Sequence, residues 1–249
     1  MRHLLVINPN TSDSVTALLR THILQASGPD VAVHMATARF GARYISSEAS
    51  YAVAAHATLD AWAAWIADGG PTPDAVLIGC FGDPGLLALR ECSAAPVTGL
   101  AEAAFLEAAQ HGRFAVVTGG VAWKPMLQRL AYSLGYGDTL VHIHTVEATG
   151  AELAADPVAA RALLATACRT VAEQHDVQAV ILGGAGLAGM AALIQSEVRV
   201  PVIDSVLAGA RQAQICGNAA NSMSADARLP GAWLGLSPAL MALTSVATV

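Results

Sequence analysis

The chain carries one sequence pattern twice, and this repeat limits how it can fold. Residues 74–83 read Asp-Ala-Val-Leu-Ile-Gly-Cys-Phe-Gly-Asp, and about a hundred residues later residues 178–187 read Gln-Ala-Val-Ile-Leu-Gly-Gly-Ala-Gly-Leu. A second matching pair follows at similar spacing, Pro-Val-Thr-Gly at 96–99 and Pro-Val-Ile-Asp at 201–204. Two similar halves that face each other would form one cleft from equivalent strand ends. The repeat then places Cys80 opposite Gly184 in that cleft.

Short apolar segments alternate with longer alanine-rich stretches of helical periodicity. We expect strands at Leu4–Ile7, Val31–Met35, Ala75–Ile78, around Val97, Phe114–Val117, Leu140–His144, Ala179–Leu182 and Val202–Ile203. Helices are expected near 13–26, 48–67, 84–92, 101–111, 123–134, 155–175, 187–197 and 205–215. This alternation predicts an α/β protein with two pseudosymmetric lobes, each a four-stranded parallel sheet flanked by helices.

The repeat also predicts how the chain divides. We expect residues 1–100 together with 205–249 to form the first α/β lobe and residues 101–204 the second, with the active site in the cleft between them. The segment from about residue 205 should pack back on the first lobe. Residues 218–230 are polar and typical of a loop, and Ser237-Pro238 is typical of the start of a last short helix.

Composition excludes several classes of protein. Hydrophobic residues make up 54% and charged residues 13%, which excludes disorder. No apolar run approaches the ~20 residues of a membrane span, and the first residues resemble a strand more than a signal peptide. A net charge of −6 with a single lysine argues against nucleic-acid or membrane partners. The four cysteines form no Cys-x-x-Cys pair, so we expect reduced thiols and a cytoplasmic protein.

Ligands of parallel sheets bind beyond the carboxyl ends of the strands. Here those ends are residues 8–12, 80–83, 118–120 and 184–186. Small and hydroxyl residues dominate the four turns, and they contain no arginine, lysine or histidine. Such turns can donate backbone N–H groups and hydroxyls to an anionic or imide-like ligand.

Cys80 is the first candidate for chemistry. It ends a predicted strand, and Asp83 and Pro84 are expected to be the N-cap and first residue of the next helix. A thiol just before a helix N-terminus would have its thiolate form favoured. The alternative is a small buried residue at a tight strand end. The other three cysteines fall in or at the ends of helical patterns, and we expect structural roles for them.

Residues 184–189 form a Gly-x-Gly-x-x-Gly motif between a strand and a helix. Asp204 follows twenty residues after Gly184, which is the arrangement of a dinucleotide-binding fingerprint. The duplication explains the same residues without a nucleotide, because Gly82 and Gly99 match Gly186 and Asp204. A nicotinamide-dependent oxidoreductase therefore remains an alternative.

A histidine pair and a short polar segment are less specific signals. His142 and His144 alternate on one strand face and could supply half of a metal site, but no third ligand follows at suitable spacing. We expect an ordinary pair on an edge strand and no metal. Residues 44–47, Tyr-Ile-Ser-Ser, precede a helix and either close over the cleft or form a solvated helix start.

Five blocks of the sequence resemble a known family. They are Val-Ile-Asn-Pro-Asn-Thr-Ser at 6–12, Gly-Cys-Phe-Gly-Asp-Pro-Gly-Leu at 79–86, Pro-Val-Thr-Gly-Leu-Ala-Glu-Ala-Ala at 96–104, Leu-Gly-Gly-Ala-Gly-Leu-Ala-Gly at 182–189 and Val-Pro-Val-Ile-Asp at 200–204. The chain resembles the aspartate/glutamate/hydantoin racemases over about residues 1–210, and most closely the hydantoin and allantoin racemase branch. The resemblance implies two pseudosymmetric lobes and an isomerase that needs neither cofactor nor metal.

In that family two cysteines act on opposite faces of the substrate Cα, one as base and one as acid. The resemblance implies that Cys80 is the first, whereas Gly184 stands at the position of the second and offers no proton. A cysteine at residue 184 should therefore raise racemisation. Arylmalonate decarboxylases also have a single active-site cysteine, in their second half, so a decarboxylase is an alternative. A binding protein that has lost racemisation is another.

The favoured interpretation is a racemase-family enzyme that acts at an acidic Cα through an enolate-like intermediate, with Cys80 as acid and base. Its substrate would be a hydantoin, an amino acid or a malonate-like acid, and we expect a homo-oligomer. The expected substrate-binding residues are Asn8, Pro9, Thr11, Ser47, Phe81, Gly82, Thr118, Gly119, Ala185 and Gly186.

Overall fold

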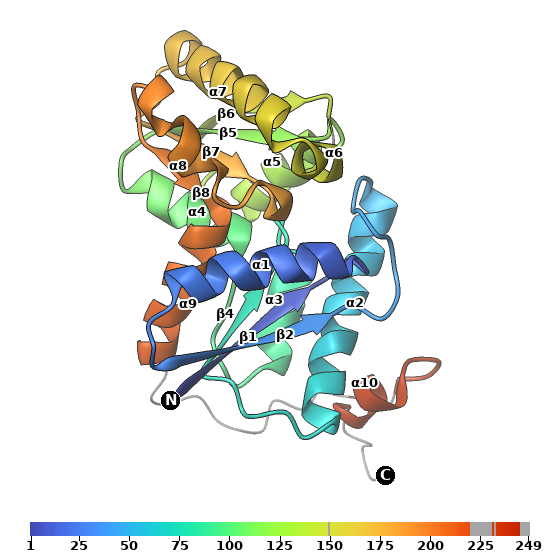
Figure 1. The fold of residues 1–249 in the computed structure, drawn as a ribbon. Helices are drawn as coiled ribbons and strands as arrows, with labels where there is room; N and C mark the ends of the chain where they lie inside the picture. The colour runs from blue at the N-terminus through green and yellow to red at the C-terminus, as the bar shows by residue number, and fades with distance from the viewer. Residues whose placement is uncertain (149, 220–230, 232, 245–249) are drawn as a thin grey trace.

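The computed structural model describes residues 1–148, 150–219, 231 and 233–244 (Figure 1). Its first half contains β1 (Arg2–Asn8), α1 (Asp13–Ala26), β2 (Val31–Thr37), α2 (Glu48–Ala67), β3 (Ala75–Ile78), α3 (Leu86–Cys92), β4 (Val97–Gly99) and α4 (Leu100–Ala109). The second half contains β5 (Phe114–Gly119), α5 (Trp123–Ser133), β6 (Leu140–Val146), α6 (Gly150–Ala155), α7 (Pro157–Gln174), β7 (Ala179–Gly183), the 3-10 turn η1 (Ala185–Leu187), α8 (Met190–Ile194), the 3-10 turn η2 (Gln195–Glu197), β8 (Val202–Asp204) and α9 (Ser205–Ala219). A last helix, α10 (Pro238–Ala242), follows.

The eight strands form two sheets of identical order. The first sheet runs β2-β1-β3-β4 and the second β6-β5-β7-β8, and every pairing is parallel. Strands β3, β5 and β7 are buried along their entire length, as expected of parallel strands covered on both faces. The predicted fold class, two pseudosymmetric α/β lobes with four parallel strands each, is confirmed.

The helices that follow the fourth strand of each sheet cross to the other lobe. Helix α4 leaves β4 but packs on β7 and β8, whereas α9 leaves β8 and packs on β3, β4 and α1. The two helices also pack on each other, and Figure 1 shows them where the two lobes meet. The expected lobe boundaries at residues 100/101 and 204/205 fall at the first turns of these exchanged helices.

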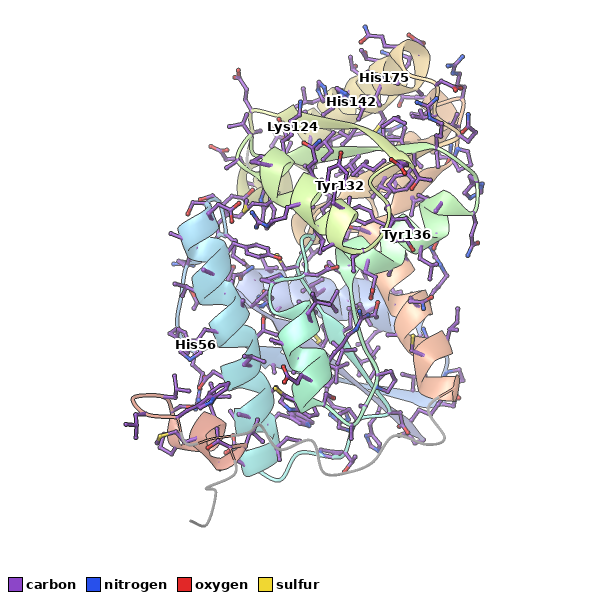
Figure 2. The ribbon with its side chains drawn as sticks, turned by 180° about the vertical axis from the view of Figure 1, so that it is seen from behind. His56, Lys124, Tyr132, Tyr136, His142 and His175 are labelled. Atoms are coloured by element: carbon purple, nitrogen blue, oxygen red, sulfur yellow. The ribbon has the colours of Figure 1, made fainter. Side chains whose placement is uncertain are left out.

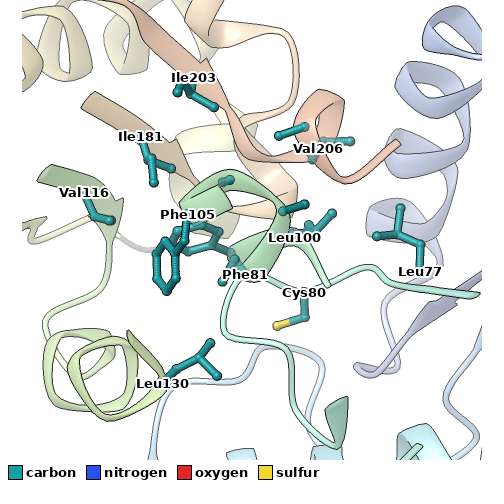
Figure 3. Close-up of a cluster of buried hydrophobic side chains, with 14 of the residues drawn as sticks. Leu77, Cys80, Phe81, Leu100, Phe105, Val116, Leu130, Ile181, Ile203 and Val206 are labelled. Carbon is teal, nitrogen blue, oxygen red and sulfur yellow. The ribbon is translucent and has the colours of Figure 1, made fainter. Parts of the chain in front are cut away.

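A continuous hydrophobic cluster joins the lobes. It contains Leu77 and Phe81 from the first sheet and its following turn, Ile181 and Ile203 from the second sheet, and Phe105 from the exchanged helix α4 (Figure 3). Two smaller clusters, one in each lobe, pack helices against the sheets. Because the central cluster draws on both lobes, burial of apolar surface holds the strand ends of the two sheets toward each other.

One predicted helix differs from the structure. The single helix expected at 187–197 is wrong: η1, α8 and η2 replace it. Gly189 interrupts the segment with φ of +82°, which a right-handed helix cannot contain, and a Cβ there would collide with the ring of His22. The helix expected at 155–175 forms as α7 and begins at Pro157, because Asp156 is its N-cap and accepts from the N–H of Ala159 (3.0 Å).

The C-terminal helix begins as predicted. The Ser237 hydroxyl accepts a hydrogen bond from the N–H of Leu240 (3.2 Å), and α10 packs on α2 of the first lobe. The polar stretch expected at 218–230 lies almost wholly outside the described residues. Within the described part of the chain, no helix combines the length and the apolarity that crossing a membrane requires.

Candidate active site

A cavity of about 450 Å³ opens where the inner strands of both sheets end. All four strand-end turns contribute to its wall: Asn10 and Ser12 after β1; Gly79, Cys80 and Phe81 after β3; Thr118 and Gly119 at the end of β5; Gly183, Gly184, Ala185, Gly186 and Leu187 at and after β7. This is the place where a parallel sheet binds ligands. Of the predicted site residues, Cys80, Phe81, Thr118, Gly119, Gly184, Ala185 and Gly186 are thus brought together.

Cys80 lies at a tight turn directly after β3. The N–H of Asp83 donates to its carbonyl (3.1 Å), and only 7% of the residue is exposed. Burial raises the pKa of the Cys80 thiol, and the nearby Asp83 carboxylate raises it further. Cys80 is therefore a neutral thiol at neutral pH in the free protein.

The expectation of a helix-stabilised thiolate is wrong. Helix α3 begins at Leu86 and its N-cap is Gly85, with φ of +87°, so neither Asp83 nor Pro84 begins it. Its N-terminus is therefore separated from Cys80 by the intervening turn. Burial disfavours the charged thiolate, and no helix N-terminus at the sulfur offsets this cost. The pKa of Cys80 is therefore raised and not lowered.

Gly184 occupies the equivalent turn of the second lobe. The N–H of Leu187 donates to its carbonyl (3.0 Å), just as that of Asp83 donates to Cys80. The N–H of Gly184 donates to the Ser205 hydroxyl at the start of α9 (3.1 Å). Its φ of +148° and ψ of +133° form a conformation that side chains disfavour. The backbone conformation of this turn therefore favours glycine at residue 184.

Asp83 caps α4, the exchanged helix, rather than α3. Its carboxylate accepts from the N–H groups of Ala101 (2.9 Å) and Glu102 (2.7 Å), and its own φ is +53°. Burial raises the pKa of Asp83 to about 7, and Glu102 adds to the shift while the backbone N–H groups oppose it. A Cβ at Gly99 would overlap the Asp83 carboxylate, so glycine at residue 99 makes room for this cap.

Asp204 performs the same capping in the second lobe from the position equivalent to Gly99. Its carboxylate accepts from the N–H groups of Gly189 (2.6 Å), Val206 (2.9 Å) and Leu207 (3.1 Å). A dinucleotide fingerprint needs this acidic side chain for a ribose hydroxyl and needs the motif to open a helix. Here the carboxylate is buried and bound to backbone, and 3-10 turn η1 follows Gly184. The geometry of this motif therefore disfavours the oxidoreductase alternative.

Aromatic rings close one side of the cavity. The ring of Phe81 occupies the space that a Cβ at Gly183 would need, and it meets Phe105 edge-on with ring centroids 6.2 Å apart. Trp123 lies against Gly82, where a Cβ would collide with its indole. Gly82 itself does not line the cavity, and its carbonyl accepts from the Tyr51 hydroxyl (2.7 Å).

The turn after β1 presents different residues from those predicted. Asn8 is fully buried, and its amide donates to the Asn10 side chain (3.0 Å) and to Thr16 (3.0 Å), so it shapes the turn. Pro9 and Thr11 belong to the same turn and are absent from the cavity wall. Asn10, Ser12 and Ser14 line it instead, with the hydroxyls of the two serines 2.9 Å apart.

The loop between β2 and α2 closes the cavity from the first lobe. It contributes Arg43, Tyr44 and Ile45 to the wall, and the Tyr44 hydroxyl donates to the Gly119 carbonyl of the second lobe (3.4 Å). Ser47 lies outside the wall and begins α2 through a capping box with Ser50. Arg43 was not predicted to line the cavity, because nothing in the sequence of a non-repeated loop of this kind indicates where it folds.

The histidines lie elsewhere. The His142 ring stacks on that of His175 at 4.0 Å, both lie in the second lobe (Figure 2), and neither lines the cavity. His142 and His144 have ring centroids 6.4 Å apart. Among the described residues, no group of three or more histidine, cysteine or acidic side chains is placed to hold a metal ion.

The fold and the cavity define a class: a two-lobed α/β protein with a cavity between pseudosymmetric halves. The family model described as Asp/Glu/hydantoin racemase matches residues 4–213. The chain therefore belongs to the Asp/Glu/hydantoin racemase family, and the resemblance seen in the sequence is confirmed.

Curated and solved relatives agree with this assignment. The chain is 31% identical over 210 residues to a hydantoin racemase from Pseudomonas sp. (strain NS671), covering 84% of this chain and 83% of that protein. The allantoin racemase structure from Klebsiella pneumoniae superposes with a TM-score of 0.87 at 28% identity, covering 98% and 99% of the two chains. That from Pseudomonas fluorescens superposes with a TM-score of 0.84 at 26% identity, covering 89% and 93%.

Proposed function

We propose that this protein is a cofactor-independent isomerase of the racemase family that moves a proton at the acidic Cα of a hydantoin, with Cys80 as the acid and base. One observation carries the proposal: Cys80 is buried at the strand-end turn that lines the cavity between the lobes. The hydantoin and allantoin racemases similar to this chain support the choice of substrate class.

Proton removal from a hydantoin Cα leaves a planar enolate whose negative charge lies on the adjacent carbonyl oxygen. The substrate-binding groups proposed for it are the Thr118 hydroxyl and the small residues Gly119, Ala185 and Gly186, which leave backbone within reach of a flat ring. The Cys80 thiolate removes the proton, and the resulting thiol returns one. Because burial raises the pKa of Cys80, turnover should increase with pH through the neutral range.

The second face of the intermediate is where this chain departs from the two-cysteine scheme. Gly184 supplies no proton, so removal and return both take place on the Cys80 face. Hydrogen exchange at Cα is then the primary activity, and inversion is slower than exchange. A disubstituted malonate offered to the same site would lose CO₂ and be protonated from the Cys80 side alone.

The proposal also covers the setting of the enzyme. The four cysteines are free thiols in the structure, which fits a reducing cytoplasm. We propose that the enzyme works there as a homo-oligomer, without a metal ion or an organic cofactor.

Deuterium exchange tests the proposal directly. NMR would follow loss of the Cα–H signal in D₂O for substituted hydantoins, aspartate and glutamate, with wild-type protein, Cys80→Ala and the matched control Cys216→Ala. Cys216 lies on α9, outside the cavity wall. Cys80→Ala should slow exchange by roughly 10²–10⁴-fold and Cys216→Ala should leave it unchanged. No exchange by folded wild-type protein with any hydantoin, or full activity in Cys80→Ala, would show a binding protein or another mechanism.

A further inference from the structure

The cavity wall carries a single charge. Among the described residues that line it, Arg43 is charged and no aspartate, glutamate, lysine or histidine is present. The other side chains are apolar, hydroxyl, amide or thiol groups and glycine backbone. A lone cation beside a largely apolar hollow favours a ligand that brings a negative charge to it.

Arg43 also has no partner within the described part of the protein. Eight arginines in that part form ion pairs, and Arg199 donates to the carbonyl of Ala172. Arg43 and Arg20 have neither an ion pair nor a hydrogen bond in the described structure. Arg20 lies on α1 outside this cavity, whereas Arg43 faces it. All the hydrogen-bond donors of the Arg43 guanidinium are thus available to a ligand.

The loop that carries Arg43 is fixed on both sides. Before it, Arg39 binds Asp60 through two hydrogen bonds of 2.8 and 3.0 Å, and the Ala42 carbonyl accepts from the N–H of Thr11 (3.1 Å). After it, Tyr44 reaches the Gly119 carbonyl and Ile45 is 2% exposed. A cation held on an anchored loop can select among ligands, because little loop ordering is needed on binding.

Arg43 and the reacting thiol of Cys80 lie at different depths in the cavity: Cys80 is buried and Arg43 is exposed. Cys80 is 7% exposed and Thr118 4%, whereas Arg43 is exposed at the rim of the same cavity. A substrate whose reacting carbon meets Cys80 can then reach Arg43 with its side arm. The guanidinium plane matches a carboxylate through two parallel hydrogen bonds.

We propose that Arg43 is a specificity-determining residue that binds a carboxylate on the side arm of the substrate, so that the preferred substrates are hydantoins of acidic amino acids. This inference rests on the proposed function for its reaction. The binding of the carboxylate by Arg43 can be measured separately from that reaction. The amide analogue of the same size lacks the charge and gains only a neutral hydrogen bond.

The experiment compares the hydantoins of glutamate and glutamine, which differ only in a terminal carboxylate or amide. Deuterium exchange gives kcat/KM and calorimetry gives the dissociation constant, each for wild-type protein, Arg43→Gln, Arg43→Lys and the charge-matched control Arg20→Gln. Wild-type protein should prefer the carboxylate by roughly 10- to 100-fold. Arg43→Gln should bring the ratio close to one, Arg43→Lys should retain part of it, and Arg20→Gln should keep it.

The outcomes separate this inference from the proposed function. Exchange with no preference for the carboxylate, or a preference that persists in Arg43→Gln, overturns the role of Arg43 and leaves the proposed function standing. Carboxylate-selective binding that is lost in Arg43→Gln, without any exchange, supports Arg43 and overturns the proposed reaction. Folded protein that neither binds nor exchanges either compound overturns the role of Arg43, and the proposed function falls with it only if no other hydantoin exchanges.

Discussion

Asp83 and Gly99 together provide in the first lobe the helix cap that Asp204 provides alone in the second. The Asp83 carboxylate reaches the N–H groups two and three residues after Gly99, and Asp204 reaches those two and three residues after itself. Glycine at residue 99 leaves the space that the carboxylate fills. Asp83 also closes the turn of Cys80, so one buried carboxylate connects the reactive turn to the exchanged helix.

Exchanging these two residues should reproduce the arrangement of the second lobe in the first. Gly99→Asp alone should destabilise the protein by about 2 kcal/mol or more, because it places a second carboxylate on the Asp83 carboxylate. The double variant Asp83→Gly with Gly99→Asp should recover much of this loss, since the residue 99 backbone is extended and accepts a side chain. Urea unfolding of both single variants and the double variant measures the coupling, expected at about 0.5–3 kcal/mol. Simple additivity would contradict the shared role.

The raised pKa of Asp83 makes stability depend on pH. Its pKa in the folded protein is about 7, above the ordinary 3.8 of an aspartate, so the folded state binds the proton more tightly. The stabilisation is fully present below pH 4 and is lost as pH rises through 7. The free energy of unfolding of wild-type protein relative to Asp83→Asn should therefore fall by about 4 kcal/mol across this range. The Asp138→Asn variant, changed at an exposed residue, is the control for net charge. If the difference in free energy of unfolding between wild type and Asp83→Asn did not change with pH, the raised pKa of Asp83 would be refuted.

Gly184→Cys should restore a thiol on the second face, but at a cost in stability. A side chain at φ of +148° is strained by about 1–3 kcal/mol, so Gly184→Cys and Gly184→Ala should both lower the free energy of unfolding by that amount. Gly184→Ala has the strain without the thiol and is the matched control. Racemisation by Gly184→Cys should exceed that of Gly184→Ala by up to roughly 10²–10⁴-fold. Equal racemisation rates in the two folded variants would contradict the two-face geometry.

The stereochemical course of exchange distinguishes one active face from two. Since Cys80 is the single thiol among the described residues of the cavity wall, an enantiopure hydantoin should take up deuterium faster than it loses optical purity. Chiral chromatography with mass detection measures both rates in one sample, and protein-free samples give the spontaneous rate. A disubstituted malonate should give one enantiomer, opposite in hand to that from enzymes whose cysteine lies in the second half. Equal rates of exchange and racemisation, or a racemic product, would refute single-face protonation.

The repeat was enough to predict the two sheets and the assembly of Cys80, Thr118 and Gly184 around one cavity. Strand ends are fixed by hydrophobic pattern, and parallel sheets place their ends together, so these positions follow from sequence. The capping partner of Asp83 did not follow, because it depends on a helix that packs on the opposite lobe. Arg43 was missed for a related reason: its loop has no counterpart in the repeat, and tertiary contacts with Gly119, Asp60 and Thr11 hold it in position.

The crossing of α4 and α9 has a consequence for the origin of the site. A chain of half this length would lack the helix that covers its own sheet, and only a second copy could supply it, in a symmetric dimer. Every residue of such a dimer's site would occur twice, so its two faces would carry two thiols or none. A single chain that contains both halves is free of that constraint. Here position 80 carries a cysteine while position 184 has a backbone conformation suited to glycine.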